Sequence, residues 1–506
     1  MGGMLPSACL STIVERHGSK AFHVGIAEMN GWRNSMEDAH IIYLKEDWAF
    51  FGVFDGHGGD QCSAFAAKRI REKLDEKGCP ADDAEVKQLI LGVDQEFLDT
   101  GRPSGSTAAM CIVHKPSGGG KHILRVINAG DSRVILGRRD GTIVDGGGTE
   151  QGLTTDHKPG HPLEAERIER CGGRVEIAAG GIPRVNGDLA VSRGFGDAQC
   201  KQTGGPGPED HPVTADPELG RFECDQADFL LIVCDGVSEG QAAGQTLFPN
   251  PEVVKFVAER LKEDMDPGAA ARAVCHKAVD TNSKDNITCM CVLFTEWDER
   301  GKAKHEFTPG PVSSTNKTFI SAYKSFAERA DLSLGEAVKM RYENILEELQ
   351  SNSLEASKVD ALTKEKNDIG EPSGTKGSNE YNAFFENWEE ENAKNSGSGG
   401  GGGGGLLGGL SPEILRSLMA APPDEGTGEF VTTPPLEELK AAIERHEALT
   451  WDERHKQVAE KTGEVMERDP KDGTSKIRFK DCSITAWLPT AILELAEPDT
   501  GTDVSI

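Results

Sequence analysis

The chain has 506 residues, a formal net charge of -29 and an aromatic content of 6%. This length is enough for two or three domains, each with its own core. The negative charge argues against sequence-independent binding to nucleic acid, because a phosphate backbone repels such a surface. The longest apolar run, near 229–234, is far shorter than the ~18 residues that a membrane span needs, and no signal peptide is expected either.

The 12 cysteines favour a reducing cell interior. Several of them, such as Cys234 and Cys289, lie within apolar runs, where a free thiol behaves as a small hydrophobic side chain. No CxxC pair occurs, so neither a zinc knuckle nor a thioredoxin-like site is expected. We therefore expect a cytoplasmic protein, a nuclear protein, or one found in both places.

The first 300 residues alternate strand-like and helix-like segments. Apolar runs predict strands at 48–54, 107–114, 122–128, 133–137, 228–234 and 287–296. Amphipathic periodicity predicts helices at 61–77, 83–98, 162–173, 251–264 and 268–280. Short turns between strands, such as "NAGDSR", indicate hairpins, so we expect an α+β fold with largely antiparallel sheets.

Beyond residue 300 the composition becomes polar and acidic. We divide the chain into a first globular domain at 1–300, a helical and acidic extension at 301–395, a Gly-rich linker at 396–409 and a C-terminal region at 410–506. Within these parts, helices are predicted at 334–350, 411–421 and 435–448 and a strand at 476–488. The extension is expected to be largely flexible and the C-terminal region partly disordered. The chain beyond residue 300 is either a regulatory or docking segment or a disordered spacer.

Acidic residues stand at the ends of several predicted strands. Asp55, Asp131 and Asp235 each follow an apolar run, whereas Asp285 precedes one. If the strands next to Asp235 and Asp285 pair antiparallel, both acids lie at the same rim of the sheet. Two carboxylates about 4 Å apart repel by about 4 kcal/mol at an effective dielectric near 20, so such a cluster either takes up protons or holds divalent cations. A single acid of this kind is usually a turn or cap residue, but four of them point to oxygen ligands for Mg²⁺ or Mn²⁺.

A series of short motifs follows in order through the same 300 residues. The motifs are "GWRNSMEDAH" (31–40), "VFDGHGG" (53–59), "SGSTA" (104–108), "NAGDSRVIL" (128–136), "LTTDHKP" (153–159), "ERI…GGRV" (166–175), "RVNGDLAVSRGFGD" (184–197), "LIVCDGVSEG" (231–240) and "KDNITCMCV" (284–292). In order and spacing they resemble the PP2C (PPM) family of metal-dependent protein serine/threonine phosphatases. The resemblance implies an α-β-β-α sandwich of two antiparallel sheets flanked by helices, and it does not reach beyond about residue 300.

The resemblance also implies a ligand set for two Mg²⁺ or Mn²⁺ ions: Asp55, the Gly56 carbonyl, Asp235, Asp285, Glu37 and Asp38. In that set Asp55 bridges the two ions and Asp38 orients bound water. The family's usual "DGxWD" is replaced by "DGVSEG" here, so Asp131 and Glu239 are the candidates for a third, weaker metal site.

Two further residues take catalytic roles by the same resemblance. Arg33 would clamp the phosphate with its planar fork of donors, and His57 would act as general acid for the leaving oxygen. The activity implied is the hydrolysis of phosphoserine and phosphothreonine in proteins by attack of a metal-bridging hydroxide. Residues 161–187 occupy the position of the family's flap, a mobile segment beside the active site whose glycines include Gly180 and Gly181.

Other functions are weighed against this one. The alternative is a phosphatase-fold scaffold that acts through its acidic C-terminal extension, although the retained ligand set argues against a loss of catalysis. Cysteine-dependent phosphatases, calcineurin-like phosphatases and P-loop kinases are not expected, because no cysteine has an arginine six positions later and neither GNHE nor GxxxxGK[ST] occurs. The partners expected are phosphorylated proteins, and we expect a monomer with tail-mediated protein partners.

Overall fold

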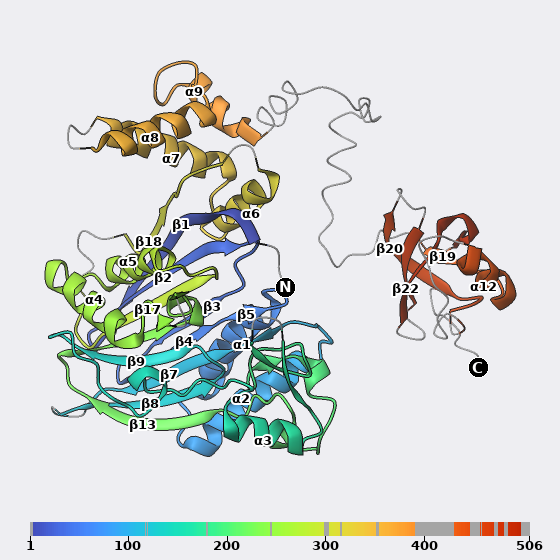
Figure 1. Cartoon of the computed structure of the whole chain (residues 1–506), viewed down its shortest axis with the longest axis horizontal. Helices are drawn as coiled ribbons and strands as arrows, with labels where there is room; N and C mark the ends of the chain where they lie inside the picture. Colours follow the sequence, from blue (N-terminus) through green and yellow to red (C-terminus); the bar gives the residue numbers. More distant parts are fainter. Residues whose placement is uncertain are drawn as a thin grey trace. The chain divides into compact units, whose positions relative to one another are not determined.

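The computed structural model describes residues 4–116, 118, 120–178, 181–242, 245–297, 303–313, 316–350, 354–389, 430–445, 456, 458–469, 474–479 and 484–496. The chain divides into two compact units, Met1–Gly400 and Gly401–Ile506, which Figure 1 colours along the sequence. The Gly-rich linker predicted at 396–409 and the helix predicted at 411–421 lie outside the described residues.

Two antiparallel sheets form the centre of the first unit. The six-stranded sheet has the order β18 (His305–Thr308), β1 (Met4–Gly18), β2 (His23–Arg33), β17 (Ile287–Leu293), β14 (Asp228–Val233) and β9 (Arg133–Arg138). The five-stranded sheet has the order β13 (Glu218–Cys224), β8 (His122–Ala129), β7 (Ala108–His114), β4 (Trp48–Phe54) and β3 (Ala39–Leu44). Every pair of neighbouring strands in these two sheets is antiparallel, as the hairpin turns predict.

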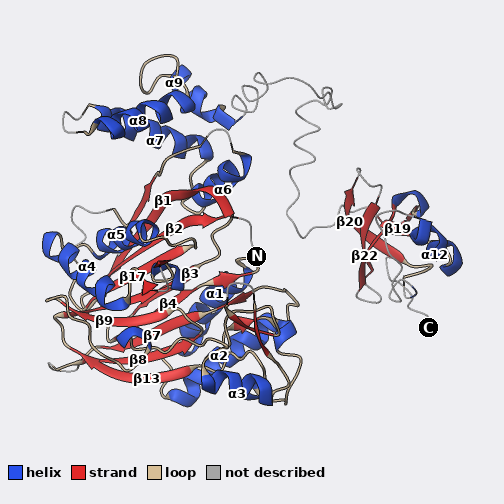
Figure 2. Ribbon diagram, in the orientation of Figure 1, coloured by secondary structure: helices blue, strands red, loops and turns tan. Residues whose placement is uncertain are grey.

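Helices cover the outer face of each sheet, as Figure 2 shows. Helices α4 (Asn250–Glu263) and α5 (Pro267–Asp280) pack on the six-stranded sheet, and α1 (Gln61–Lys77) and α2 (Asp83–Leu98) on the five-stranded sheet. Three apolar layers result, and each large side chain buried in them stabilises the fold by roughly 1.5–3 kcal/mol. Phe51 and Ile232 belong to the layer between the sheets, and Val254 and Ile70 to the two outer layers. The α-β-β-α sandwich predicted from the sequence is therefore confirmed.

The segment predicted to be a flap contains a short helix and a hairpin. Helix α3 (Pro162–Arg170) is followed by β10 (Val175–Ile177) and β11 (Pro183–Val185). The buried carboxylate of Glu164 holds the base of this segment, since it accepts hydrogen bonds from Arg167 Nη1 at 2.7 Å, Arg193 Nη2 at 2.7 Å and Ser192 Oγ at 2.6 Å. Gly181 has a φ of +81° in the hairpin turn, whereas Gly180 lies outside the described residues.

The extension after the sandwich forms helices around a further apolar core, which also includes Leu5 and Cys9 of β1. Helices α6 (Lys317–Glu328), α7 (Leu334–Leu349), α8 (Ala356–Ile369) and α9 (Asn379–Glu386) enclose buried side chains that include Tyr323 and Trp388. Only the second of these helices is predicted from the sequence. It begins with a capping box, in which Ser333 Oγ accepts from Glu336 N and the Glu336 side chain accepts from Ser333 N.

The second unit contains a five-stranded antiparallel sheet with the order β22 (Ile484–Pro489), β21 (Thr474–Phe479), β20 (Thr462–Asp469), β19 (Phe430–Thr432) and β23 (Glu494–Ala496). Helix α12 (Leu436–Arg445) lies within the helix predicted at 435–448. Its Leu439 and Ile443 are buried with Val465 and Ile477 of the sheet. The single strand predicted at 476–488 is wrong, because parts of this segment belong to β21 and β22, which pair with one another.

Candidate active site

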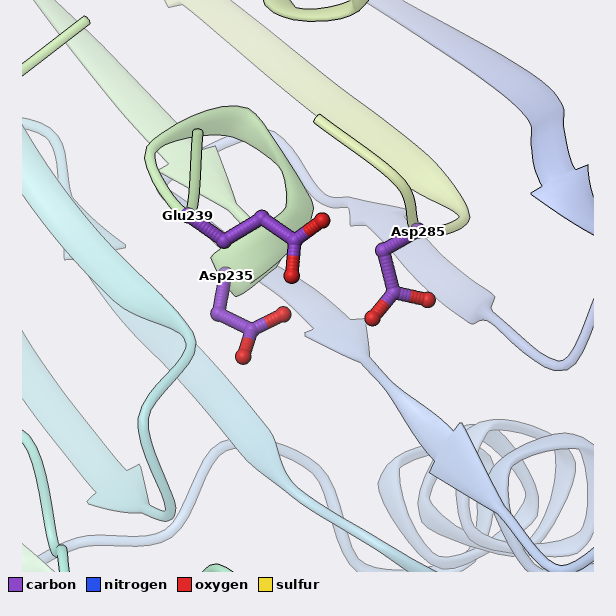
Figure 3. Close-up of side chains that lie close together, drawn as sticks. All are labelled: Asp235, Glu239 and Asp285. Carbon is purple, nitrogen blue, oxygen red and sulfur yellow. The ribbon is translucent and has the colours of Figure 1, made fainter. Parts of the chain in front are cut away.

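The pairing of β14 with β17 brings two acidic residues to one rim of the six-stranded sheet. Val233 lies opposite Cys289 in this antiparallel pair, so the residues that follow β14 meet those that precede β17. Asp235, Glu239 and Asp285 each offer a carboxylate oxygen, and these oxygens all lie within 4.8 Å of one another. Figure 3 shows the three side chains around a common space.

Asp55 lies beside Asp235 of this cluster and comes from the other sheet. It directly follows β4, and its carbonyl oxygen accepts hydrogen bonds from Thr107 N at 2.9 Å and Ser106 Oγ at 3.2 Å. Burial, followed by the charges of Asp38 and Asp235, raises the pKa of Asp55 well above its ordinary value. Burial and neighbouring carboxylates likewise raise the pKa of Asp235 to about 7. The negative charge of these acids is therefore costly unless a cation compensates it.

Glu37 and Asp38 complete the rim from the segment between β2 and β3. Asp38 is 1% exposed, and its Oδ2 accepts a hydrogen bond from Thr288 Oγ1 at 2.6 Å. Glu37 Oε1 accepts from Ser35 Oγ at 2.9 Å, and its Oε2 accepts from Gly59 N at 3.1 Å. A Cβ atom at Gly56 would lie 2.3 Å from the Glu37 carbonyl oxygen, so only glycine permits this close approach of the two loops.

The donor set fits a hard divalent cation. The side-chain groups at the rim are carboxylates, and no cysteine thiol or imidazole belongs to the close cluster in the described part of the chain. The buried Oδ1 of Asp38 accepts no hydrogen bond from any described residue, which leaves an oxygen for water or a cation. Crowded oxygen ligands with raised pKa values are the arrangement that Mg²⁺ and Mn²⁺ stabilise.

Arg33 and His57 lie at the edge of the same rim. Arg33 Nη2 pairs with Asp285 Oδ2, and its side chain is 44% exposed, so the other donors of its guanidinium are accessible. His57 Nε2 donates to the carboxylate of Asp197. Burial alone would lower the pKa of His57, but the charge and the hydrogen bond of Asp197, together with the charges of Asp131 and Glu37, outweigh it and raise that pKa. The imidazole therefore favours its protonated form, as a general acid requires.

Comparison with known proteins decides the family. The family model for protein phosphatase 2C matches residues 22–287. The chain belongs to the protein phosphatase 2C family. It is 31% identical over 320 residues to protein phosphatase 2C homolog 2 of Schizosaccharomyces pombe, a match that covers 58% of this chain and 79% of that relative. It is 32% identical over 313 residues to protein phosphatase 1A of Homo sapiens, with 56% and 74% covered.

A solved structure supports the same assignment. A phosphatase from a pathogenic strain of Toxoplasma gondii superposes with a TM-score of 0.51 at 28% identity and covers 59% of this chain and 100% of that one. The chain is therefore a protein phosphatase of the 2C family. All predicted site residues, from Arg33 to Asp285, lie within the region that the family model matches, whereas the helical extension and the second unit lie outside it.

The two residues assigned to a third metal site have different neighbours in this phosphatase. Asp131 Oδ2 pairs with Lys158 Nζ, which lies 4.0 Å from Asp235 Oδ2. Glu239 instead faces Asp235 and Asp285, and its Oε1 accepts from Lys284 N at 2.6 Å and Ser283 Oγ at 3.1 Å. The third site therefore stays a prediction, and Lys158 is a cation that already occupies part of the space between Asp131 and Asp235.

Sequence reasoning missed two residues that contact the predicted site. Asp197 holds His57, and Lys158 pairs with Asp131. Both lie inside motifs that carry the family resemblance, "GFGD" and "DHKP", so the motifs were the available signal. The partners of both residues are far away in the sequence, where no local pattern reveals a pairing.

Proposed function

We propose that this member of the 2C family hydrolyses phosphoserine and phosphothreonine in proteins and that it uses Mg²⁺ or Mn²⁺ held at the carboxylate rim. One observation carries the proposal: the ends of β14 and β17 bring Asp235 and Asp285 into one cluster, and the end of β4, from the other sheet, brings Asp55 beside Asp235. Half-buried acids that crowd one another and have raised pKa values are costly to ionise without a cation.

The proposed ligands are Asp55, Asp235, Asp285, Glu37, Asp38 and the Gly56 carbonyl. When bound, the cations would supply Lewis acidity, which activates water for attack and neutralises charge on the phosphoryl oxygens. Glu37 is prepared for this role because Gly59 N and Ser35 Oγ fix its two carboxylate oxygens. Asp38 is fixed through one oxygen by Thr288, which leaves the other to accept a hydrogen bond from water.

Arg33 and His57 act on the substrate in this proposal. Arg33 binds the phosphate oxygens through guanidinium donors that its pairing with Asp285 leaves available. His57 gives a proton to the seryl or threonyl oxygen as the P–O bond breaks, and Asp197 holds the imidazole in place during this transfer. The release of an alkoxide requires such a donor because alcohols are poor leaving groups.

Release of inorganic phosphate from a phosphothreonine peptide tests the proposal. The full chain should release phosphate only when Mn²⁺ or Mg²⁺ is added, and Asp55→Asn should abolish the release while the protein stays folded. The scaffold alternative expects Mn²⁺ to bind without any release of phosphate. Activity that survives complete chelation of divalent cations would contradict the proposed use of the rim.

We also propose a cytoplasmic or nuclear location. Of the cysteines in the described residues, eleven are free and ten of these are buried, as suits a reducing compartment. Among the described helices, none has both the length and the apolar composition needed to cross a membrane. Localisation of the tagged full chain by microscopy tests this proposal, and a secreted protein would contradict it.

A further inference from the structure

Helix α6 of the extension ends beside the segment that carries Glu37 and Asp38. Arg329, the residue that directly follows this helix, donates from Nη2 to the Asp38 carbonyl oxygen at 3.0 Å and to Glu28 Oε2 at 3.1 Å. The Glu28 side chain is 5% exposed and that of Arg329 is 31% exposed. The extension therefore holds the backbone of a proposed cation ligand by a hydrogen bond from a charged donor, which is stronger than one between neutral groups.

A second contact between α6 and the same segment is apolar. Phe326, 1% exposed, packs in one cluster with Met36, which is 6% exposed, and with Ile13 of β1. Helix α6 and the residue after it thus reach both neighbours of Glu37: Phe326 shares an apolar cluster with Met36, and Arg329 donates to the Asp38 carbonyl. Interiors packed in this way transmit small displacements, because side chains have little free volume.

Glu28 connects Arg329 with the strand that orients Asp38. It lies opposite Thr288 in the pairing of β2 with β17, and Thr288 donates to Asp38 Oδ2. His40 Nδ1 donates to the other oxygen of Glu28 at 2.8 Å. Thr288 of the sheet therefore holds the side chain of Asp38, and Arg329 of the extension holds its carbonyl group. Glu28 links these two partners, because it lies opposite Thr288 and pairs with Arg329.

We propose that helix α6 positions the cation-binding segment, with Arg329 as the positioning residue, so that the affinity of the catalytic unit for divalent cations depends on the helical extension. The inference rests on the proposed function in that Glu37 and Asp38 serve the cation. The family model matches no residue beyond 287, and Arg329 lies 42 residues further along the chain. The family assignment therefore says nothing of this role.

Whether the removal of Arg329 weakens or tightens cation binding distinguishes a positioning role from a purely electrostatic one. Arg329 carries a positive charge close to the rim, and a positive charge by itself weakens the binding of a cation. Its removal would therefore tighten binding if charge were its only influence. If Arg329 holds Asp38 in place, its removal weakens binding by about 10-fold, the lower end of what partners of metal ligands contribute.

Titration of the full chain with Mn²⁺ alone, followed by isothermal calorimetry and by the electron paramagnetic resonance of free Mn²⁺, tests the inference. Arg329→Met should raise the Kd for Mn²⁺ by about 10-fold. The matched control is Lys324→Met, which removes one positive charge from the same helix. Lys324 Nζ pairs with Glu389 at 3.1 Å inside the extension, and its replacement should change the Kd by less than about twofold.

Two further variants test the role of helix α6 in case the loss of charge or poor folding affects Arg329→Met. Arg329→Lys restores the charge and a donor and should recover part of the affinity. Phe326→Leu removes the ring that packs on Met36 without any change of charge, and it should weaken Mn²⁺ binding even if Arg329→Met folds poorly. Circular dichroism and thermal melting of each variant show whether the fold is kept.

Each outcome of these titrations tests either the proposed function or the role of helix α6. If the unmodified chain does not bind Mn²⁺, the proposed function fails. If it binds Mn²⁺ and the folded variants at Arg329 and Phe326 bind it equally well or more tightly, the role of α6 is overturned and the proposed function stands. A rise in Kd equal to that of Lys324→Met would also overturn this role.

Discussion

His57 Nε2 lies 2.8 Å and 2.9 Å from the two carboxylate oxygens of Asp197, although 140 residues separate them in the sequence. Asp197 is 2% exposed and adopts a φ of +53°, a conformation that costs a residue with a side chain about 1–2 kcal/mol. A Cβ atom at Gly105 would lie 2.2 Å from Asp197 Oδ2 and 2.3 Å from His57 Nε2. The side chains of His57 and Asp197 therefore fill the space that a side chain at position 105 would need.

Gly105→Ala tests this arrangement. The added methyl group should push His57 away from Asp197 and lower the turnover of a phosphothreonine peptide by about 10-fold or more, since a positioned acid contributes at least 100-fold. Gly92→Ala is the matched control, because a Cβ there meets nothing within 4 Å on the exposed face of α2. The control should keep full activity and raise the unfolding free energy by about 0.5–1 kcal/mol. Equal activities of the two variants would contradict the importance of the pair.

His57→Gln separates the acid role from a binding role. Glutamine keeps a hydrogen-bonding group but cannot supply a titrating proton, so the hydrolysis of alkyl phosphates should fall by about 100-fold or more. Aryl phosphates have a better leaving group and should slow much less. Steady-state kinetics with phosphothreonine peptide and 4-nitrophenyl phosphate measure both effects. The same loss of turnover with both substrates would show that His57 is not the acid.

Asp235→Asn should remove activity without unfolding the protein. The loss of a direct cation ligand should lower turnover by more than about 100-fold, given that even partners of ligands matter by 10–100-fold. In the absence of cations, the melting temperature should stay equal or rise, because the change removes one of several crowded acids. Asp99→Asn at the exposed end of α2 is the control and should leave both quantities unchanged. Substantial residual activity in Asp235→Asn would exclude it as a ligand.

Stability without cations should depend on pH in a defined window. Burial and neighbouring carboxylates raise the pKa of Asp38 to about 7 and that of Asp285 to about 6, against an ordinary value of 3.8. The folded protein then binds more protons than the unfolded chain between about pH 4 and pH 7, so its unfolding free energy falls as the pH rises through this window. Chemical denaturation in the presence of a chelator measures this slope, and a rise of stability across the window would contradict it.

Added cations should restore the unfolding free energy that the protein loses as the pH rises. Binding requires deprotonated carboxylates, so the stabilisation by Mn²⁺ should be larger at about pH 7.5 than at about pH 5.5. At a concentration of 100 times its Kd, one ion stabilises the fold by about 2.7 kcal/mol. Differential scanning calorimetry with and without Mn²⁺ gives the shift in melting temperature. A shift that does not change with pH would mean that the ion binds elsewhere.

The strands that carry the acids were predictable because they are buried on both faces. Every residue of β14 and β17 is buried, and such strands appear in the sequence as continuous apolar runs. The sequence did not predict β1, β2, β3, β13 or β18. Strand β1 contains a proline and shifts its register near Cys9, and β13 is an edge strand with exposed polar positions. Strand β2 is buried, but Gly25, Glu28 and Asn30 interrupt its apolar run. Edge and irregular strands carry little periodic signal.

The ligands of the candidate site could be predicted, but their supporting partners could not. Asp55, Asp235 and Asp285 follow or precede apolar runs, and this relation is local in the sequence. The pairing of Arg329 with Glu28 joins residues 301 positions apart, and that of His57 with Asp197 crosses between segments whose relative position only the fold determines. An ion pair between distant segments leaves no pattern in one sequence.

In the proposed function, carboxylates from separate strands share divalent cations at one rim. Crystals of the full chain grown with Mn²⁺ and measured at its absorption edge test it most directly. We expect strong anomalous peaks about 2.1 Å from carboxylate oxygens of Asp55, Asp235 and Asp285. A map at saturating Mn²⁺ with no peak beside these three residues would contradict it.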